Sequence, residues 1–223
     1  MNARAYLAEL LGTFLFFTIG MSSIQAVGAL GTAAPLLVVV PLGFGFGLLA
    51  AIFTFGHISG GHFNPAVSIA MAIDERLSPM DAAGYIVSQI IGAIGASTLV
   101  LVLWNQAAVI ATITAPGSGF SDVQALLLET VLTAVFMLVI LTSTRYAAAL
   151  APLAIPLTLV SIHLAAVPFT GASVNPVRSL APALLGGDVS KLWIYLAGPV
   201  VGAVIAALVF RAMDRMVPAA GAD

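Results

Sequence analysis

The feature of this sequence that most constrains its fold is the length of its uncharged segments. Residues 10–73, 82–121, 146–177 and 192–210 contain no Asp, Glu, Lys or Arg. A helix that crosses a bilayer needs about 20 mostly apolar residues, so the first segment alone is long enough for two such helices and a turn. Charged residues make up 7% of the 223 residues, against roughly 25% in soluble domains. We therefore expect a single-domain integral membrane protein, which excludes a soluble enzyme and a disordered chain.

Six membrane-spanning helices fit these segments. They are predicted over about residues 5–27, 35–56, 79–104, 122–144, 151–169 and 190–212. The side before the first helix then carries most of the basic residues, which are Arg4, Arg76, Arg145, Arg211 and Arg215. Because Lys and Arg accumulate in cytoplasmic loops, we expect a multi-pass protein of the plasma or inner membrane with cytoplasmic N- and C-termini. The net charge of −2 offers no basic face for a nucleic acid.

The two halves of the chain repeat one pattern. They cover about residues 1–106 and 121–215 and are joined by a polar linker at about 105–121. Each half has a glutamate in its first predicted helix, Glu9 or Glu129, and an Asn-Pro pair after its second. Because each half has three spanning helices, the second half enters the membrane upside down, which predicts an inverted repeat.

The two Asn-Pro pairs predict two short helices. Asn64 and Asn175 suit the N-cap position, and the prolines that follow suit the first turn. About ten apolar residues follow each pair, and at 1.5 Å per residue they span roughly half a bilayer. We expect two re-entrant half-helices whose N-termini meet at mid-membrane. Their dipoles make that point positive, and both asparagine amides can donate to one water.

Glycines four residues apart predict close packing between helices. The pairs are Gly43/Gly47, Gly56/Gly60 and Gly198/Gly202.

Three segments together resemble the signatures of the aquaporin, or major intrinsic protein, family, and in particular its prokaryotic water-selective members. They are His-Ile-Ser-Gly-Gly-His-Phe-Asn-Pro-Ala-Val at 57–67, Ser-Val-Asn-Pro-Val-Arg-Ser at 173–179, and Ala-Glu at 8–9 with Gly-Thr-Phe at 12–14. The resemblance covers the whole chain. It implies an all-α membrane bundle of six helices and two re-entrant half-helices, assembled as a homotetramer with one pore per protomer. It also implies a passive channel that conducts water and excludes protons and ions, with no catalytic residue, cofactor or metal.

The same resemblance implies which residues form the pore. The two motifs are Asn64, Pro65, Ala66 and Asn175, Pro176, Val177. The selectivity filter is Phe44, His163, Ala172 and Arg178. Pore-lining backbone comes from His62, Phe63, Ser173 and Val174. Glu9 and Glu129 are buried structural acids that brace the re-entrant segments. Independently of the family, an arginine at membrane depth must face water or a partner, which makes Arg178 the most informative charge.

Three residues depart from the family's water-selective pattern and bear on selectivity. Val177 replaces an alanine, Ala172 stands where threonine or cysteine is common, and Leu196 replaces an aromatic residue. Ser179 follows the arginine, where glycerol channels usually have aspartate. The alternative to a water channel is a facilitator for glycerol or another small neutral solute, such as ammonia or hydrogen peroxide.

Two other classes of membrane protein fit less well. An intramembrane serine protease needs an exposed serine with a histidine base, and neither 57–60 nor 171–174 has the Gly-x-Ser-Gly pattern. A secondary transporter needs an acid that binds its coupling ion. The two acids within the predicted helices, Glu9 and Glu129, are both expected to be structural. The chain has no Cys and three dispersed His, so we expect no metal site.

Overall fold

The computed structural model describes residues 2–31 and 35–216. These residues form nine helices and no strand. The helices are α1 (Ala3–Leu30), α2 (Leu36–Ser59), α3 (Pro65–Ile73), α4 (Pro79–Leu103), α5 (Gln106–Ile110), α6 (Asp122–Tyr146), α7 (Ala151–Thr170), α8 (Pro176–Gly186) and α9 (Leu192–Asp214).

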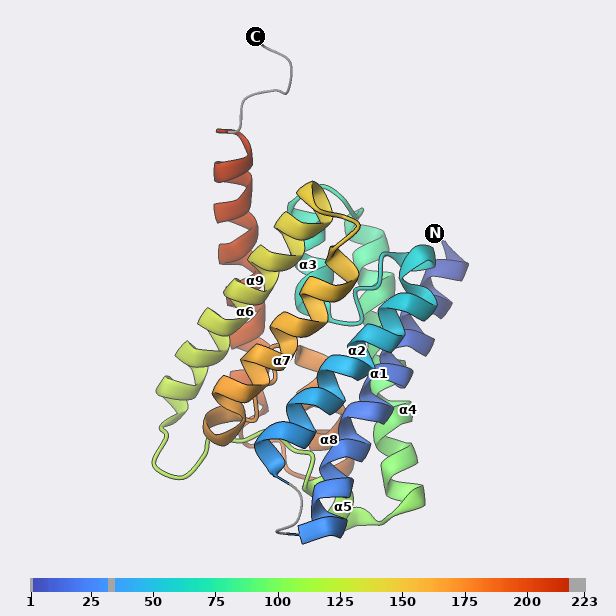
Figure 1. Cartoon of the computed structure of the whole chain (residues 1–223), viewed down its shortest axis with the longest axis vertical. Coiled ribbons are helices and arrows are strands. Elements are labelled where there is room, and N and C mark those ends of the chain that lie inside the picture. Colours follow the sequence, from blue (N-terminus) through green and yellow to red (C-terminus); the bar gives the residue numbers. More distant parts are fainter. Residues whose placement is uncertain (1, 32–34, 217–223) are drawn as a thin grey trace.

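Six of these helices are long and apolar enough to cross a membrane: α1, α2, α4, α6, α7 and α9. The prediction of six spans is confirmed, and every boundary lies within three residues of its expected place. α1 begins and α9 ends at the same end of the bundle, as an even number of spans requires (Figure 1). The fold is an all-α membrane bundle.

The two short helices α3 and α8 begin where the Asn-Pro pairs predict. Asn64 caps α3 by accepting a hydrogen bond from the backbone N–H of Ala66 (2.9 Å), and Asn175 caps α8 by accepting from Val177 (3.2 Å). The helices have 9 and 11 residues, which is too short to span a bilayer. α3 lies in the end of the bundle where α1 begins, and α8 lies in the opposite end (Figure 1). The two half-helices therefore enter from opposite sides, as the inverted repeat predicts.

The segment predicted as a polar linker contains a short helix, α5, that sequence patterning missed. Asn105 caps it by accepting from the N–H of Ala108 (2.9 Å). Gln106 donates to the carbonyl of Leu185 at the end of α8 (2.8 Å), and Gln25 of α1 donates to the carbonyl of Ala108 (3.0 Å). The polar residues that suggested a loop thus cap a helix and tie it to both halves of the bundle.

Glycines let the first and last helices of each half approach closely. A Cβ at Gly92 of α4 would collide with the carbonyl of Leu10 in α1, and one at Gly202 of α9 would collide with the carbonyl of Thr130 in α6.

Two of the three predicted glycine pairs pack against a neighbouring helix. Gly43 and Gly47 face α1, and Gly198 and Gly202 face α6. The prediction for the third pair is wrong. The nearest side chain to Gly56 is Ile52 of its own helix, and Gly60 ends α2 with a φ of +89°. These two glycines line an open cavity instead of a helix contact.

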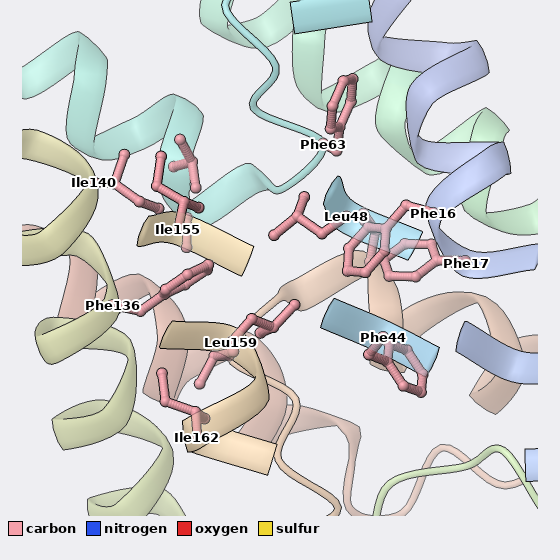
Figure 2. Packing of buried hydrophobic residues seen from close by; sticks show 14 of the residues in the cluster. Phe16, Phe17, Phe44, Leu48, Phe63, Phe136, Ile140, Ile155, Leu159 and Ile162 are labelled. Atoms are coloured by element: carbon pink, nitrogen blue, oxygen red, sulfur yellow. The ribbon is translucent and has the colours of Figure 1, made fainter. Parts of the chain in front are cut away.

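Apolar side chains of the two halves face each other in the centre of the bundle. Figure 2 shows Phe16, Phe44 and Leu48 from α1 and α2 opposite Phe136 and Leu159 from α6 and α7. All five are at most 4% exposed.

Candidate functional site

The first re-entrant segment, which joins α2 to α3, is held by Glu9 of α1. Its Oε1 accepts from the hydroxyl of Ser59 (2.6 Å) and the N–H of His62 (2.9 Å). Its Oε2 accepts from the N–H of Phe63 (2.6 Å) and the side-chain amide of Gln89 in α4 (2.8 Å). Glu9 is fully buried, so these four donors take the place of the water that would otherwise solvate the carboxylate.

The second re-entrant segment, which joins α7 to α8, is held in the same way by Glu129 of α6. Its Oε1 accepts from the hydroxyl of Thr170 (2.7 Å) and the N–H of Ser173 (2.9 Å), and its Oε2 accepts from the N–H of Val174 (2.8 Å). Glu129 is also fully buried. The oxygens of both carboxylates thus accept hydrogen bonds from the segments that precede the Asn-Pro pairs.

A tyrosine from the last helix of each half holds the start of the same segment. Tyr85 donates to the carbonyl of Ser59 (2.7 Å), and Tyr195 donates to the carbonyl of Thr170 (2.8 Å).

The two segments bind each other through their asparagines. The amide of Asn64 donates to the carbonyl of Val174 (2.9 Å), and the amide of Asn175 donates to the carbonyl of Phe63 (3.0 Å). Phe63 and Val174 have φ of +48° and +43°, a left-handed conformation that costs about 1–3 kcal/mol outside glycine. This backbone directs the N–H to the glutamate and the carbonyl to the opposite asparagine.

A narrow cavity runs from the two asparagines toward the middle of α7. Its volume is about 10 Å³. This is close to the smallest volume that holds one water, roughly 10–15 Å³. The lining residues are Phe16, Phe44, Leu48, Asn64, Phe136, Leu159, His163, Ser173, Val174, Asn175 and Arg178.

Phe44, His163 and Arg178 form one cluster in this cavity. The rings of Phe44 and His163 are stacked with centroids 4.9 Å apart, and the guanidinium of Arg178 lies 5.1 Å from the centroid of Phe44. Nη1 of Arg178 donates to the carbonyl of Thr112 in the linker (2.8 Å). All three side chains are at most 5% exposed. The cluster combines an apolar wall, an imidazole and a permanent positive charge.

Two fully buried nitrogens of this cluster have no partner among the described residues: Nε2 of His163 and Nε of Arg178. Nδ1 of His163 lies 2.9 Å from the carbonyl of Leu159. Because a carbonyl only accepts, Nδ1 carries a proton, and Nε2 of the neutral ring is an acceptor. The cluster therefore offers one acceptor, on the imidazole, and the N–H groups of the guanidinium that are not bonded to Thr112 as donors.

The structure places the other predicted site residues in different ways. Ala172 is buried with a φ of +50° but is not among the residues that line the narrow cavity. His62 is partly exposed, and its Nδ1 lies 3.1 Å from the hydroxyl of Ser68. Val177 is buried in the first turn of α8. Leu196 is 37% exposed on α9 and does not line the narrow cavity.

Sequence reasoning missed four apolar residues that wall the narrow cavity: Phe16, Leu48, Phe136 and Leu159. No signal distinguishes them in the sequence, because every spanning helix carries many such residues. A wider cavity of about 390 Å³ lies in the other end of the bundle, where Gly60, Gly61 and the exposed His57 meet the start of α7. The two cavities lie on either side of the first re-entrant segment.

Comparison with known proteins identifies the family. The model of the major intrinsic protein family matches residues 1–210. A glycerol uptake facilitator protein-like 6 of Lactiplantibacillus plantarum is 40% identical over 94% of this chain and 98% of its own length. An aquaporin Z of Rhodopseudomonas palustris is 36% identical over 96% of this chain and 95% of its own. The aquaglyceroporin structure from Plasmodium falciparum superposes with a TM-score of 0.85 at 23% identity, over 94% of this chain and 96% of that one. The fold is therefore the aquaporin-like bundle, and this multi-pass membrane protein belongs to the major intrinsic protein family, whose members are channels.

Proposed function

We propose that this chain is a passive channel that conducts water down an osmotic gradient and excludes protons and ions. The observation that carries the proposal is the cluster of Phe44, His163 and Arg178 around a cavity with room for about one water. Two stacked rings limit the cross-section, and a water entering there can donate to Nε2 of His163 and accept from Nε of Arg178. A fixed guanidinium at this point repels cations.

The asparagine pair supplies a second barrier to protons. Oδ1 of Asn64 and of Asn175 accepts from the backbone of its own half-helix, and one amide hydrogen of each goes to the opposite segment. The second amide hydrogen of each remains for water. A water that accepts from both asparagines cannot also accept a proton from its neighbour in the file. The N-termini of α3 and α8 add a positive potential there.

The alternative is a facilitator for glycerol or another small neutral solute. The relative named as a glycerol uptake facilitator-like protein is 40% identical to this chain. Ala172 also has a small side chain beside the filter. The small volume of the cavity favours water, because glycerol needs more room than a single water.

The experiment that tests the proposal is stopped-flow light scattering on proteoliposomes, with protein-free liposomes as the control. We expect fast shrinkage with a low activation energy in hyperosmotic sucrose, and no fast re-swelling in glycerol. Fast re-swelling in glycerol would favour the facilitator. Shrinkage no faster than in protein-free liposomes would contradict a water channel.

We further propose a homotetramer with one pore per protomer and with both ends of the chain in the cytoplasm. Light scattering of the detergent-purified protein tests the assembly, since four chains of 22.7 kDa are expected. The chain has no Cys, so single variants Ala147→Cys and Ser118→Cys can be labelled from one side of intact cells. We expect an impermeant reagent added outside to label only Ser118→Cys.

A further inference from the structure

Three buried hydroxyl groups form a chain behind the filter. The hydroxyl of Thr114, in the linker, donates to the hydroxyl of Ser179 in α8 (2.6 Å). Ser179 and Ser173 are also 2.6 Å apart, and Ser173 donates to the carbonyl of Asn175 (2.8 Å). All three hydroxyl-bearing residues are at most 4% exposed. None of these bonds involves the side chains of Phe44, His163 or Arg178.

The direction of the bonds in this chain is determined by the number of protons. Each hydroxyl has one proton. Ser173 gives its proton to the carbonyl of Asn175, so Ser179 must be the donor to Ser173, and Thr114 is the donor to Ser179. Thr114 donates at the start of this run, and Ser179 and Ser173 each accept once and donate once. Hydrogen bonds arranged in series in this way strengthen one another.

The chain ends at the residues that hold Arg178. Ser179 is its neighbour in the first turn of α8, and Asn175 caps that turn and accepts from the N–H of Arg178 (3.2 Å). On the linker side, Thr112 accepts from the guanidinium of Arg178, two residues before Thr114. One segment of the linker thus forms hydrogen bonds with two consecutive residues of α8.

The side chain of Thr114 also packs on the start of the second re-entrant segment. A Cβ on Gly171 would lie 3.0 Å from the methyl carbon of Thr114. Gly171 ends α7 with a φ of +78°. Thr114 therefore contacts the re-entrant segment before the filter through its methyl group and α8 after the filter through its hydroxyl.

We propose that Thr114, acting through Ser179, is a positioning residue that determines selectivity between water and larger neutral solutes. It does not line the narrow cavity. It fixes the first turn of α8 relative to the linker, and so fixes the guanidinium of Arg178 relative to Phe44 and His163. This inference rests on the proposed function, because it assigns a cause to the width of that filter.

The first half of the chain has a serine at the equivalent place with different partners. Ser68 accepts from the amide of Gln89 (3.0 Å) and lies 3.3 Å from the carbonyl of Asn64. Its bonds stay within the first half and reach no residue of the filter cluster. Ser68 therefore provides a control for removing a buried hydroxyl at the mirror position.

The test compares glycerol and water permeabilities of Thr114→Val and Ser179→Ala in proteoliposomes. Thr114→Val keeps the shape of the side chain and removes the hydroxyl. We expect both variants to raise the glycerol-to-water ratio about fivefold, which is about 1 kcal/mol in the difference between the two permeation barriers. The controls are Thr114→Ser, which keeps the hydroxyl, Ser68→Ala, and Thr54→Val, which removes a hydroxyl on the lipid-exposed face of α2. All three are expected to keep the wild-type ratio.

The double variant Thr114→Val/Ser179→Ala gives a second readout. Because the two hydroxyls act in one chain, its ratio is expected to equal that of either single variant rather than the product of both effects. If Thr114→Val does not fold, the glycerol-to-water ratio of Ser179→Ala alone is compared with that of the wild type. An unchanged ratio in Ser179→Ala and in any folded Thr114→Val, with fast water flux in the wild type, would overturn the inference and leave the proposed function standing. A wild-type chain without water flux would overturn both.

Discussion

The two re-entrant segments are built alike, and they differ near the cluster of Phe44, His163 and Arg178. In both halves a buried glutamate accepts from a hydroxyl and from two consecutive backbone N–H groups, and a tyrosine of the last helix donates to a backbone carbonyl. The corresponding distances agree within 0.2 Å. This shared part is a scaffold, because its glutamate, hydroxyl and tyrosine groups all bond to the re-entrant segments.

The difference begins four residues after each tyrosine. Gln89 stands four residues after Tyr85 and donates to both Glu9 and Ser68. Pro199 stands four residues after Tyr195 and has no side-chain donor, so the second half has no equivalent bond. In the first half, the additional bonds come from α4, the last helix of that half. In the second half, they come from the linker, where Thr112 and Thr114 bond to α8.

This comparison teaches where selectivity can arise in an inverted repeat. Bonds that both halves share hold the two asparagines at the centre. Bonds that only one half has can be changed without breaking the bonds of the shared scaffold. Arg178 and its supports belong to that second group.

Removing either glutamate is expected to have the largest effect. Glu9→Ala leaves four donors without their acceptor and Glu129→Ala leaves three, and each buried donor that stays unpaired costs about 1–3 kcal/mol. We expect both variants to lose at least about 3 kcal/mol of stability, and Glu9→Ala to lose more. Thermal unfolding of the detergent-purified protein measures this. Glu75→Ala, at an exposed ion pair with Arg211, is the control, and melting temperatures equal to wild type in both variants would refute the bracing role.

Filling the two close helix contacts tests the symmetry of the scaffold. Gly92→Ala and Gly202→Ala each place a Cβ against a backbone carbonyl of the facing helix, and such overpacking costs about 1–3 kcal/mol. We expect equal losses of stability in the two halves, measured by thermal unfolding. Gly56→Ala is the matched control, since no other helix faces it. A loss in one half only would break the comparison.

Removing Arg178 tests the part of the site that the two halves do not share. Arg178→Ala is expected to raise glycerol permeability about tenfold, the equivalent of 1.4 kcal/mol in the barrier, and to admit protons. Glycerol re-swelling and a pH-sensitive dye inside proteoliposomes measure the two fluxes. Arg145→Ala, at a partly exposed ion pair with Asp214, is the control. Glycerol and proton fluxes that stay at wild-type values would remove Arg178 from the filter.

Making the first half resemble the second is expected to have the smallest effect. Gln89→Leu removes two donated bonds, but it also removes an Oε1 that has no partner among the described residues. The net loss of stability is expected to be about 1 kcal/mol. The glycerol-to-water ratio should stay unchanged, because Gln89 does not touch the filter. A changed ratio would show that the first half also sets selectivity.

Local sequence predicted most of the scaffold and part of the candidate site. Asn followed by Pro specifies a cap and a first helical turn within a few residues, which is why α3 and α8 were predictable. The four apolar residues around the cavity were not, because a phenylalanine such as Phe16 has the same local pattern whether it faces the pore or another helix. The helix α5 was missed because a five-residue helix has no periodicity to read.

The sequence by itself determined the six spans, the two half-helices and the inverted repeat, because these depend on hydrophobic length, capping and an internal match between halves. Only the tertiary structure decided which polar groups meet. Asn64 and Val174 are 110 residues apart, and Thr114 and Ser179 are 65 apart. No local pattern pairs them, since each bond forms only after two half-helices and the linker have packed. The cluster of Phe44, His163 and Arg178 likewise brings together side chains from α2, α7 and α8, and so it exists only in the packed structure.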